Sequence, residues 1–386
     1  MQNFDFINPT MIKFGKDQIG TMNQVIPQGA KVMVLYGGGS IKRTGIYDQV
    51  MAALKGFEVI EFSGIPSNPE FEVLMDAVKI VQSDNVQFLL AVGGGSVIDG
   101  TKFISAASLY EGDDPWDLIV KQEPIMQGVP FGTVLTLPAT GSEMNYAAVI
   151  TKGETSEKLL MQGLGLFPKF SVLDPSVVST VPKRQLVNGL IDSFSHVLEQ
   201  YLTYPVGAML QDRYAESVLK TLIEVAPVIV NDPSNYEAAA NYMWCCTNAL
   251  NGMLQNGVPV DWGVHMIGHE LTALYHTDHA ITLAIVSPSY YRHMVDAKED
   301  KLIQFAERVV GITEGTKREK ALAAIDFIED YFNRLGVECK LSNYVENYDG
   351  CAQAIAKTFE DRGWFGLGEK QSVTPKLVTQ IVEAAY

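Results

Sequence analysis

The stretch QFLLAVGGGSV, residues 87–97, decides the fold. Its first six residues form a short apolar run of the kind that is typical of a β-strand. Three glycines follow at once, and glycine lets the backbone turn tightly and approach a phosphate. A helix that begins after such a turn offers its free N–H groups to negative charge. The stretch therefore predicts a strand, a turn and a helix that suit a phosphate-bearing ligand.

The same alternation extends on both sides of this stretch. β-rich runs occupy Lys31 to Tyr36 and Glu58 to Phe62, and further strands are predicted at Pro130 to Thr136 and Phe170 to Leu173. Between them, Phe71 to Gln82 repeats apolar residues at helical spacing. Alternating strands and helices predict a parallel sheet that is covered on both faces. We expect residues 1–180 to form an α/β domain with a doubly wound, mostly parallel, Rossmann-like sheet.

The second half of the chain has a different texture. Long helical patterns cover Lys183 to Thr203, Ala208 to Val230 and Tyr236 to Gln255, with few strand signals. Residues 232–235 and 255–259 carry the Pro, Gly and Asn residues that are usual between helices. We expect residues 181–386 to form a second, all-helical domain.

A second glycine cluster strengthens the prediction of a nucleotide site. Tyr36 leads into Gly37, Gly38, Gly39 and Ser40, much as Val92 leads into Gly93, Gly94, Gly95 and Ser96. One such cluster is as often a mere turn, and neither copy fits the GxGxxG fingerprint. Two copies in a β/α pattern favour a ligand outside the carboxyl ends of the strands. A third loop, TLPATGSE at residues 136–143, adds hydroxyl groups for phosphate or nicotinamide at Thr136, Thr140 and Ser142.

The residues after the first cluster indicate which dinucleotide is used. A pocket for NAD usually places an acid against the ribose 2′-hydroxyl, whereas NADP needs that position free of negative charge. Here Ser40 is followed by Lys42 and Arg43, with no acid among them. The pattern favours NADP(H), although a solvated first helical turn would have the same sequence.

Histidines gather in two short windows. Asp192 and His196 are four residues apart, and His265 and His269 repeat that spacing, so each pair projects from one helical face. His279 follows in a turn-like segment. Imidazoles with one carboxylate suit a divalent transition metal such as Zn or Fe(II). The sequence HELTA at residue 269 lacks the second histidine of HExxH, which counts against a metalloprotease.

Composition excludes several classes of function. The 386 residues are 47% hydrophobic and 19% charged, which is enough for two domains with cores of their own. A net charge of −16 disfavours nucleic acid, because binding a polyanion requires a basic face. Residues 1–16 carry no export signal, and no apolar run is long enough to span a membrane, so we expect a cytoplasmic protein. The four cysteines lack CxxC spacing and are interpreted as buried small side chains.

Taken together, these motifs resemble the iron-containing, group III alcohol dehydrogenases over essentially the whole chain. The resemblance is greatest to the branch of NADPH-dependent butanol dehydrogenases and aldehyde reductases, which has a dehydroquinate synthase-like architecture. The stretches that carry it are NPTMIKFGK, YGGGSIKRTG, VGGGSVIDGTKF, TLPATGSE, NGLIDSFSHVLEQY and DWGVHMIGHELTALYHTDHAITLAI. Many members have glycine after the last metal histidine where this chain has Ala280, a difference that we interpret as a mark of the branch.

The resemblance implies specific roles for these residues. It implies one divalent metal, Fe or Zn, in a cleft between the domains, and a non-ligand histidine near the nicotinamide at His269. It also implies a homodimer or larger homo-oligomer. The implied metal ligands are Asp192, His196, His265 and His279. The implied cofactor positions are Gly37, Gly38, Ser40, Gly94, Gly95, Ser96, Asp99, Thr140, Ser142 and Lys158.

The substrate is expected to be a small aldehyde or alcohol such as butanal or butanol. The segment from Trp244 to Tyr291 contains no Lys or Arg, which suits a neutral substrate better than an anion. The same residues would also serve as ordinary helix cores. Three alternatives remain at this point: a glycerol- or diol-type dehydrogenase, a non-redox lyase like dehydroquinate synthase, and a binding protein without catalysis.

Overall fold

The computed structural model describes residues 1–122, 124–155 and 157–386, and the chain divides into two compact units. The sheet unit comprises Ile7–Leu186 and Asn231–Asn251. The helical unit comprises Met1–Phe6, Val187–Val230 and Gly252–Tyr386. The sequence analysis divided the chain once, near residue 180. In the structure, residues 1–6 cluster with the helical unit and residues 231–251 with the sheet unit. Residues 231–251 belong with the sheet unit because their helix bonds to it: Tyr242 donates to the carbonyl of Pro138 at 2.6 Å.

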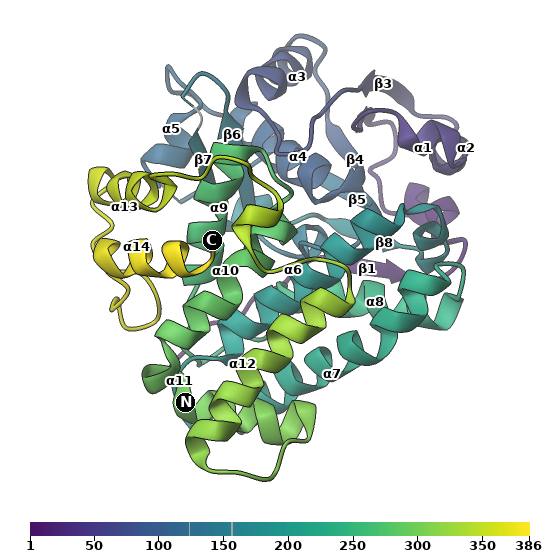
Figure 1. The fold of residues 1–386 in the computed structure, drawn as a ribbon. Coiled ribbons are helices and arrows are strands. Elements are labelled where there is room, and N and C mark those ends of the chain that lie inside the picture. The colour runs from purple at the N-terminus through teal and green to yellow at the C-terminus, as the bar shows by residue number, and fades with distance from the viewer. Residues whose placement is uncertain (123, 156) are drawn as a thin grey trace. The chain divides into compact units, whose positions relative to one another are not determined.

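The sheet unit alternates strands and helices, as predicted (Figure 1). Its strands are β1 (Met11–Phe14), β2 (Lys31–Leu35), β3 (Glu58–Phe62), β4 (Phe88–Gly94), β5 (Phe131–Leu137), β6 (Ala147–Lys152), β7 (Glu157–Gln162) and β8 (Phe170–Leu173). Its α-helices are α1 (Ser40–Arg43), α2 (Ile46–Ala53), α3 (Phe71–Ser83), α4 (Gly95–Ala107), α5 (Asp117–Val120) and α8 (Tyr236–Ala249). Short 3-10 helices are η1 (Gln18–Gln24), η2 (Ser142–Met144), η3 (Leu164–Leu166) and η4 (Pro175–Thr180).

Six strands form one parallel sheet in the order β1-β8-β5-β4-β2-β3. The central strands are buried nearly throughout, as in parallel sheets that are covered on both faces. β2, β4 and β5 are neighbours, so their carboxyl ends lie along one edge of the sheet. β6 and β7 form a separate antiparallel hairpin that the sequence analysis did not predict. The predicted α/β class is confirmed, and the glycine turns lie at the edge where ligands bind.

The helical unit contains no named strand among the residues that the structure describes. The helix α6 (Lys183–Tyr201) begins in the sheet unit and continues into this one. Its other helices are α7 (Met209–Asn231), α9 (Gly263–Tyr275), α10 (His279–His293), α11 (Val295–Phe305), α12 (Lys317–Arg334), α13 (Cys351–Asp361) and α14 (Pro375–Ala384), with the short η5 (Ala306–Val310) and η6 (Leu341–Asn343). Within the described ranges, no helix is both long and apolar enough to cross a bilayer. All four cysteines are buried, as predicted.

Candidate active site

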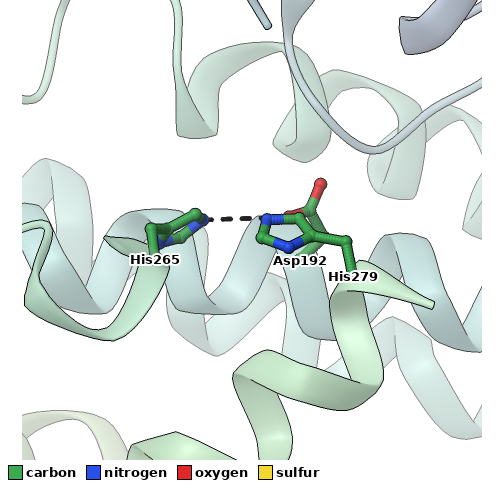
Figure 2. A group of neighbouring side chains, drawn as sticks. All are labelled: Asp192, His265 and His279. Carbon is green, nitrogen blue, oxygen red and sulfur yellow. Dashed lines mark ion pairs between the residues drawn. The ribbon is translucent and has the colours of Figure 1, made fainter. Parts of the chain in front are cut away.

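Three side chains from three helices converge in the helical unit: Asp192 of α6, His265 of α9 and His279 of α10 (Figure 2). One ligand atom of each lies within 4.8 Å of the other two. The Oδ1 atom of Asp192 is 3.9 Å from Nε2 of His265 and 3.9 Å from Nε2 of His279. Ligands that bind one zinc ion at about 2.0–2.2 Å lie about 3–4 Å from one another. The spacing therefore suits a single divalent ion.

His196, the fourth predicted ligand, lies one turn after Asp192 on α6. Its Nδ1 atom is 3.8 Å from Oδ1 of Asp192, and its ring stacks on His265 with centroids 4.5 Å apart. His196 Nδ1 and His265 Nε2 are buried and have no hydrogen-bond partner among the described residues. Buried polar atoms are normally bonded, and a metal would satisfy both nitrogens. The donor set therefore fits a divalent metal held by one carboxylate and imidazoles.

Burial also keeps His196 in the form that binds metal. Removal from water lowers the pKa of His196 well below its usual range, and the neighbouring His265 lowers it further. A metal binds the neutral imidazole, so the ring need not lose a proton when an ion arrives. The low pKa thus agrees with a ligand role for this residue.

Glu199 orients His265, and the sequence analysis missed it. Its carboxylate contacts Nδ1 of His265 and accepts hydrogen bonds from the backbone N–H groups of Val264 at 2.7 Å and His265 at 3.1 Å. A carboxylate at Nδ1 fixes the tautomer and leaves Nε2 for a metal. Glu199 follows His196 by three residues on α6, so helical spacing on that face was an available signal.

His269 lies beside the three converging residues. It follows His265 by one turn of α9, and its ring centroid is 4.7 Å from that of His279 and 6.3 Å from that of His265. The group of ligand atoms within 4.8 Å of one another includes neither His269 nor His196, but His196 differs in that its Nδ1 atom is 3.8 Å from Oδ1 of Asp192. The assignment of His269 as a non-ligand histidine stays a prediction.

A cavity of about 600 Å³ adjoins α9, the helix that carries His265. Its lining includes Met266, the residue after His265, together with Trp364 and Phe365 from the loop 363–371. None of the described residues that line it is charged. Such a wall suits a neutral organic molecule better than a carboxylate or phosphate.

In the sheet unit, the second glycine turn and the TLPATGSE loop lie against each other. A Cβ atom on Gly95 would be 2.5 Å from Oγ1 of Thr140, so only glycine permits this approach. Ser142 donates to Oδ1 of Asp99 at 2.5 Å, and the backbone N–H of Ser142 donates to Oγ1 of Thr140 at 3.2 Å. Four of the predicted cofactor residues are thus brought together at the start of α4.

Lys102 supports this cluster and was missed by the sequence analysis. Its buried ammonium donates to Oγ of Ser142 at 2.8 Å, to Oδ1 of Asn145 at 2.7 Å and to the carbonyl of Ala147 at 2.7 Å. Burial lowers the pKa of Lys102 to about 8, while Asp99 and Glu143 oppose the shift. Lys102 lies three residues after Asp99 on α4, a spacing that places both on one face.

Lys158 is linked to the same turn through Asn68. The ammonium of Lys158, on β7, donates to Oδ1 of Asn68 at 3.0 Å, and the backbone N–H of Asn68 donates to Oγ of Ser96 at 3.3 Å. Thr136 lies in β5, one residue before the strand ends. Gly94 ends β4, where a Cβ atom would be 2.9 Å from Cβ of Leu137.

The first glycine turn follows β2, and Ser40 begins α1. An acid does lie nearby, which the sequence analysis did not foresee: Glu61, on the adjacent strand β3. Its carboxylate accepts from the hydroxyls of Tyr36 at 2.8 Å and Tyr47 at 2.6 Å, and Lys42 lies 3.4 Å away. Hydrogen bonds from Tyr47, followed by those from Tyr36 and Lys42, lower the pKa of Glu61. The acid is therefore charged and already engaged.

Comparison with known proteins agrees with this geometry. The sequence profile "Iron-containing alcohol dehydrogenase" matches residues 9–175, and "Fe-containing alcohol dehydrogenase family, C-terminal" matches residues 186–386. This chain belongs to the iron-containing alcohol dehydrogenase family. The predicted family is thereby confirmed, and with it an oxidoreductase of the alcohol dehydrogenase type.

Individual relatives match over the full length. The chain is 49% identical to the NADPH-dependent aldehyde reductase YqhD of Escherichia coli (strain K12), with 100% of both proteins covered. It is 42% identical to the probable NADH-dependent butanol dehydrogenase 1 of Bacillus subtilis (strain 168), again with 100% of both covered. A crystal structure of the E. coli protein superposes with a TM-score of 0.98 at 48% identity, covering 100% of this chain and 99% of that one.

Proposed function

We propose that this protein uses NADPH to reduce small neutral aldehydes, such as butanal, to primary alcohols with the help of one divalent metal. The observation that carries the proposal is the convergence of Asp192, His265 and His279. It is joined by two buried imidazole nitrogens, His196 Nδ1 and His265 Nε2, that have no hydrogen-bond partner among the described residues. When bound, the metal supplies a Lewis acid for the carbonyl oxygen and the reduced nicotinamide supplies the hydride.

The protein's own residues have separate tasks in this reaction. Asp192, His196, His265 and His279 hold the metal, and Glu199 keeps Nε2 of His265 available. Reduction of an aldehyde consumes one hydride at carbon and one proton at oxygen. His269, or a water that it orients, would supply the proton, because an imidazole can donate and accept protons near neutral pH.

A neutral substrate is supported by the charges around the metal helix. The segment from Trp244 to Tyr291 has no Lys or Arg, and the cavity beside Met266 has no charged residue in its described lining. An anionic substrate would lack a cationic partner there. The name of the E. coli relative, an aldehyde reductase, supports the same class of substrate.

The preference for NADPH rests on the surroundings of the first glycine turn. Ser40 and Lys42 offer a hydroxyl and a cation, and the carboxylate of Glu61 is occupied by two tyrosine hydroxyls. The E. coli relative is named NADPH-dependent, whereas the B. subtilis relative is named NADH-dependent. By the same criterion the charge of Glu61 counts against NADPH, and its engagement by Tyr36, Tyr47 and Lys42 reduces the repulsion of a 2′-phosphate.

The decisive experiment measures the initial rate of NADPH oxidation with butanal, beside NADH, on protein that is stripped with a chelator and then restored with Fe(II) or Zn(II). We expect turnover that disappears on stripping, returns with metal and favours NADPH. Restored turnover that favours NADH would overturn the cofactor preference only. An absence of oxidation with either metal would point instead to a lyase or to a binding protein.

A further inference from the structure

A lysine in the core of the helical unit contacts two carboxylates. Lys298, on α11, is fully buried, and its ammonium pairs with Asp261 and with Glu369, at 3.0 Å from Oε1 and 2.8 Å from Oε2. It also donates to the carbonyl of Leu202 at 2.7 Å. A charge removed from water is costly, so it persists only when its partners compensate for lost hydration. These three acceptors provide that compensation.

Asp261 connects Lys298 to the start of α9, the helix that carries His265. Its Oδ1 atom accepts the backbone N–H of Gly263, the first residue of α9, at 2.8 Å, and the hydroxyl of Tyr290 at 2.6 Å. The first N–H groups of a helix have no partner within the helix and must find one outside it. Asp261 therefore fixes where α9 begins.

Glu199 holds the next two N–H groups of the same helix. It accepts from Val264 and His265, and its own carbonyl accepts the backbone N–H of Asp261 at 2.9 Å. Two buried carboxylates thus hold the first turn of α9, which carries His265. Lys298 is the cation that pairs with Asp261, so it stabilises the negative charge at this helix end.

We propose that Lys298 is a positioning residue for the metal centre, acting through Asp261 on the first turn of α9 and hence on His265. The inference rests on the metal site of the proposed function. Without the ammonium, Asp261 and Glu369 would face each other in the core, and Asp261 would no longer be held against Gly263. His265 would then lose its fixed place relative to Asp192, and metal affinity would fall.

Lys301 offers a matched control. It lies one turn further along α11, is also buried, and pairs with Asp212 at 2.5 Å. Lys301 makes no described contact with Asp261 or Glu199. Substitution of either lysine removes a buried cation. Of the two, Lys298 is the one that pairs with Asp261 and so contacts a residue that caps α9.

The experiment compares apoproteins of the wild type, Lys298→Met and Lys301→Met. Their Zn(II) affinities are measured by competition with a chromophoric chelator, and the absorption spectra of their Co(II) forms report the ligand geometry. We expect Lys298→Met to bind Zn(II) about tenfold more weakly, the lower end of the range for groups that support a ligand, with a shifted Co(II) spectrum. Lys301→Met should lower the thermal midpoint and leave metal affinity and spectrum unchanged.

The double variant Lys298→Met/Glu369→Gln removes one cation and one acid together, and it decides the matter if the single variant fails to fold. We expect the double variant to fold and still bind Zn(II) weakly. Wild-type affinity and an unaltered Co(II) spectrum in a folded Lys298 variant would overturn the inference. Failure of the wild type to bind either metal would instead overturn the proposed function.

Discussion

Substitution of His269 tests whether this single residue supplies the proton in the proposed reaction. Its ring lies beside that of His279, outside the converging ligand atoms. We expect His269→Gln to lower kcat by roughly 10²-fold, the lower end of the usual contribution of a proton-transfer group, with metal content unchanged. Metal analysis beside steady-state kinetics checks this. The exposed His276, substituted by Asn, serves as the control, and loss of metal from the His269 variant would contradict its assignment as a non-ligand.

We expect Lys102 to make cofactor affinity depend on pH. Because burial lowers its pKa to about 8, the ammonium is charged below that pH and loses its proton above it, at a lower pH than in the unfolded chain. Its positive charge favours an anionic cofactor, so the dissociation constant of NADPH should rise as pH increases through about 8. Fluorescence titration from pH 7 to pH 9.5 measures it. In Lys102→Met the step should vanish; a step of equal size there would assign the dependence to another group.

The lowered pKa of Lys102 also makes the free energy of unfolding depend on pH, and this free energy increases with pH while cofactor affinity decreases. Between about pH 8 and the ordinary pKa of 10.5, the unfolded chain holds a proton on Lys102 that the folded chain has released. Unfolding therefore takes up a proton, and the contribution of this group to the free energy of unfolding increases with pH across that window. Below pH 8 the buried charge reduces stability, and the acceptors on Ser142, Asn145 and Ala147 offset part of that cost.

Residue spacing explains which site residues could be predicted. The prediction of Asp192, His196 and His265 rests on histidines and acids at intervals of four on a helix, which are a strong signal for a shared ion, and the structure brings these side chains close together. The sequence analysis missed four buried charged residues, because the sequence alone does not distinguish a buried charged residue from a solvated one. They are Glu199, Asp261, Lys102 and Lys298. Only the fold shows that these four are buried and paired.

Among the structural elements, the strand-to-helix turns offer the sharpest test of cofactor binding. A Cβ atom on Gly38 would meet no atom within 4 Å, and its φ lies outside the left-handed region that favours glycine. Gly38→Ala should therefore leave the apoprotein as stable as the wild type. If a phosphate approaches this backbone, loss of one charge-assisted hydrogen bond costs about 1.5–3 kcal/mol, which weakens NADPH binding roughly ten- to hundredfold.

Gly20→Ala is the matched control for this substitution. Gly20 also lies in the sheet unit, has open space around it and is remote in sequence from the glycine turns. It should change neither stability nor NADPH affinity. Calorimetric titration of both variants would reject the cofactor role of the first turn if Gly38→Ala bound NADPH as tightly as Gly20→Ala.

Elements differed in how well they could be predicted. The strands at residues 31–35, 58–62 and 170–173 were found because apolar runs between helices are distinctive. The edge strand β1 and the hairpin β6–β7 were missed because they are short and partly exposed, so their apolar residues form no continuous run. The helix predicted to reach Gln255 ends at Ala249, shortly before Gly252, which has a positive φ.

For the molecule as a whole, the two units should respond separately to the two ligands. The predicted metal ligands lie in the helical unit, whereas the predicted cofactor residues lie in the sheet unit. A ligand at 100 times its dissociation constant stabilises what it binds by about 2.7 kcal/mol, or about a hundredfold in protection from hydrogen exchange. We expect Zn(II) alone to slow exchange in α6, α9 and α10, and NADPH alone in the segments after β2 and β4.

Hydrogen exchange resolved by mass spectrometry would follow these segments. The strand β1 and the helix α14 provide internal references, since neither contributes a predicted ligand residue. Protection by NADPH confined to α9 and α10 would contradict the assignment of the glycine turns.

The support of His265 by Glu199, Asp261 and Lys298 has a consequence for how the enzyme acquires its metal in the cell. Because protein groups and not the ion hold the first turn of α9, folding need not wait for metal delivery. A preformed set of imidazoles and one carboxylate can hold either Fe(II) or Zn(II), and although affinity generally favours Zn(II), the supply of each metal also decides which one is bound. We therefore expect occupancy to follow the supply of each metal where the protein folds, so that growth conditions, and not translation or folding, set the active fraction of the enzyme.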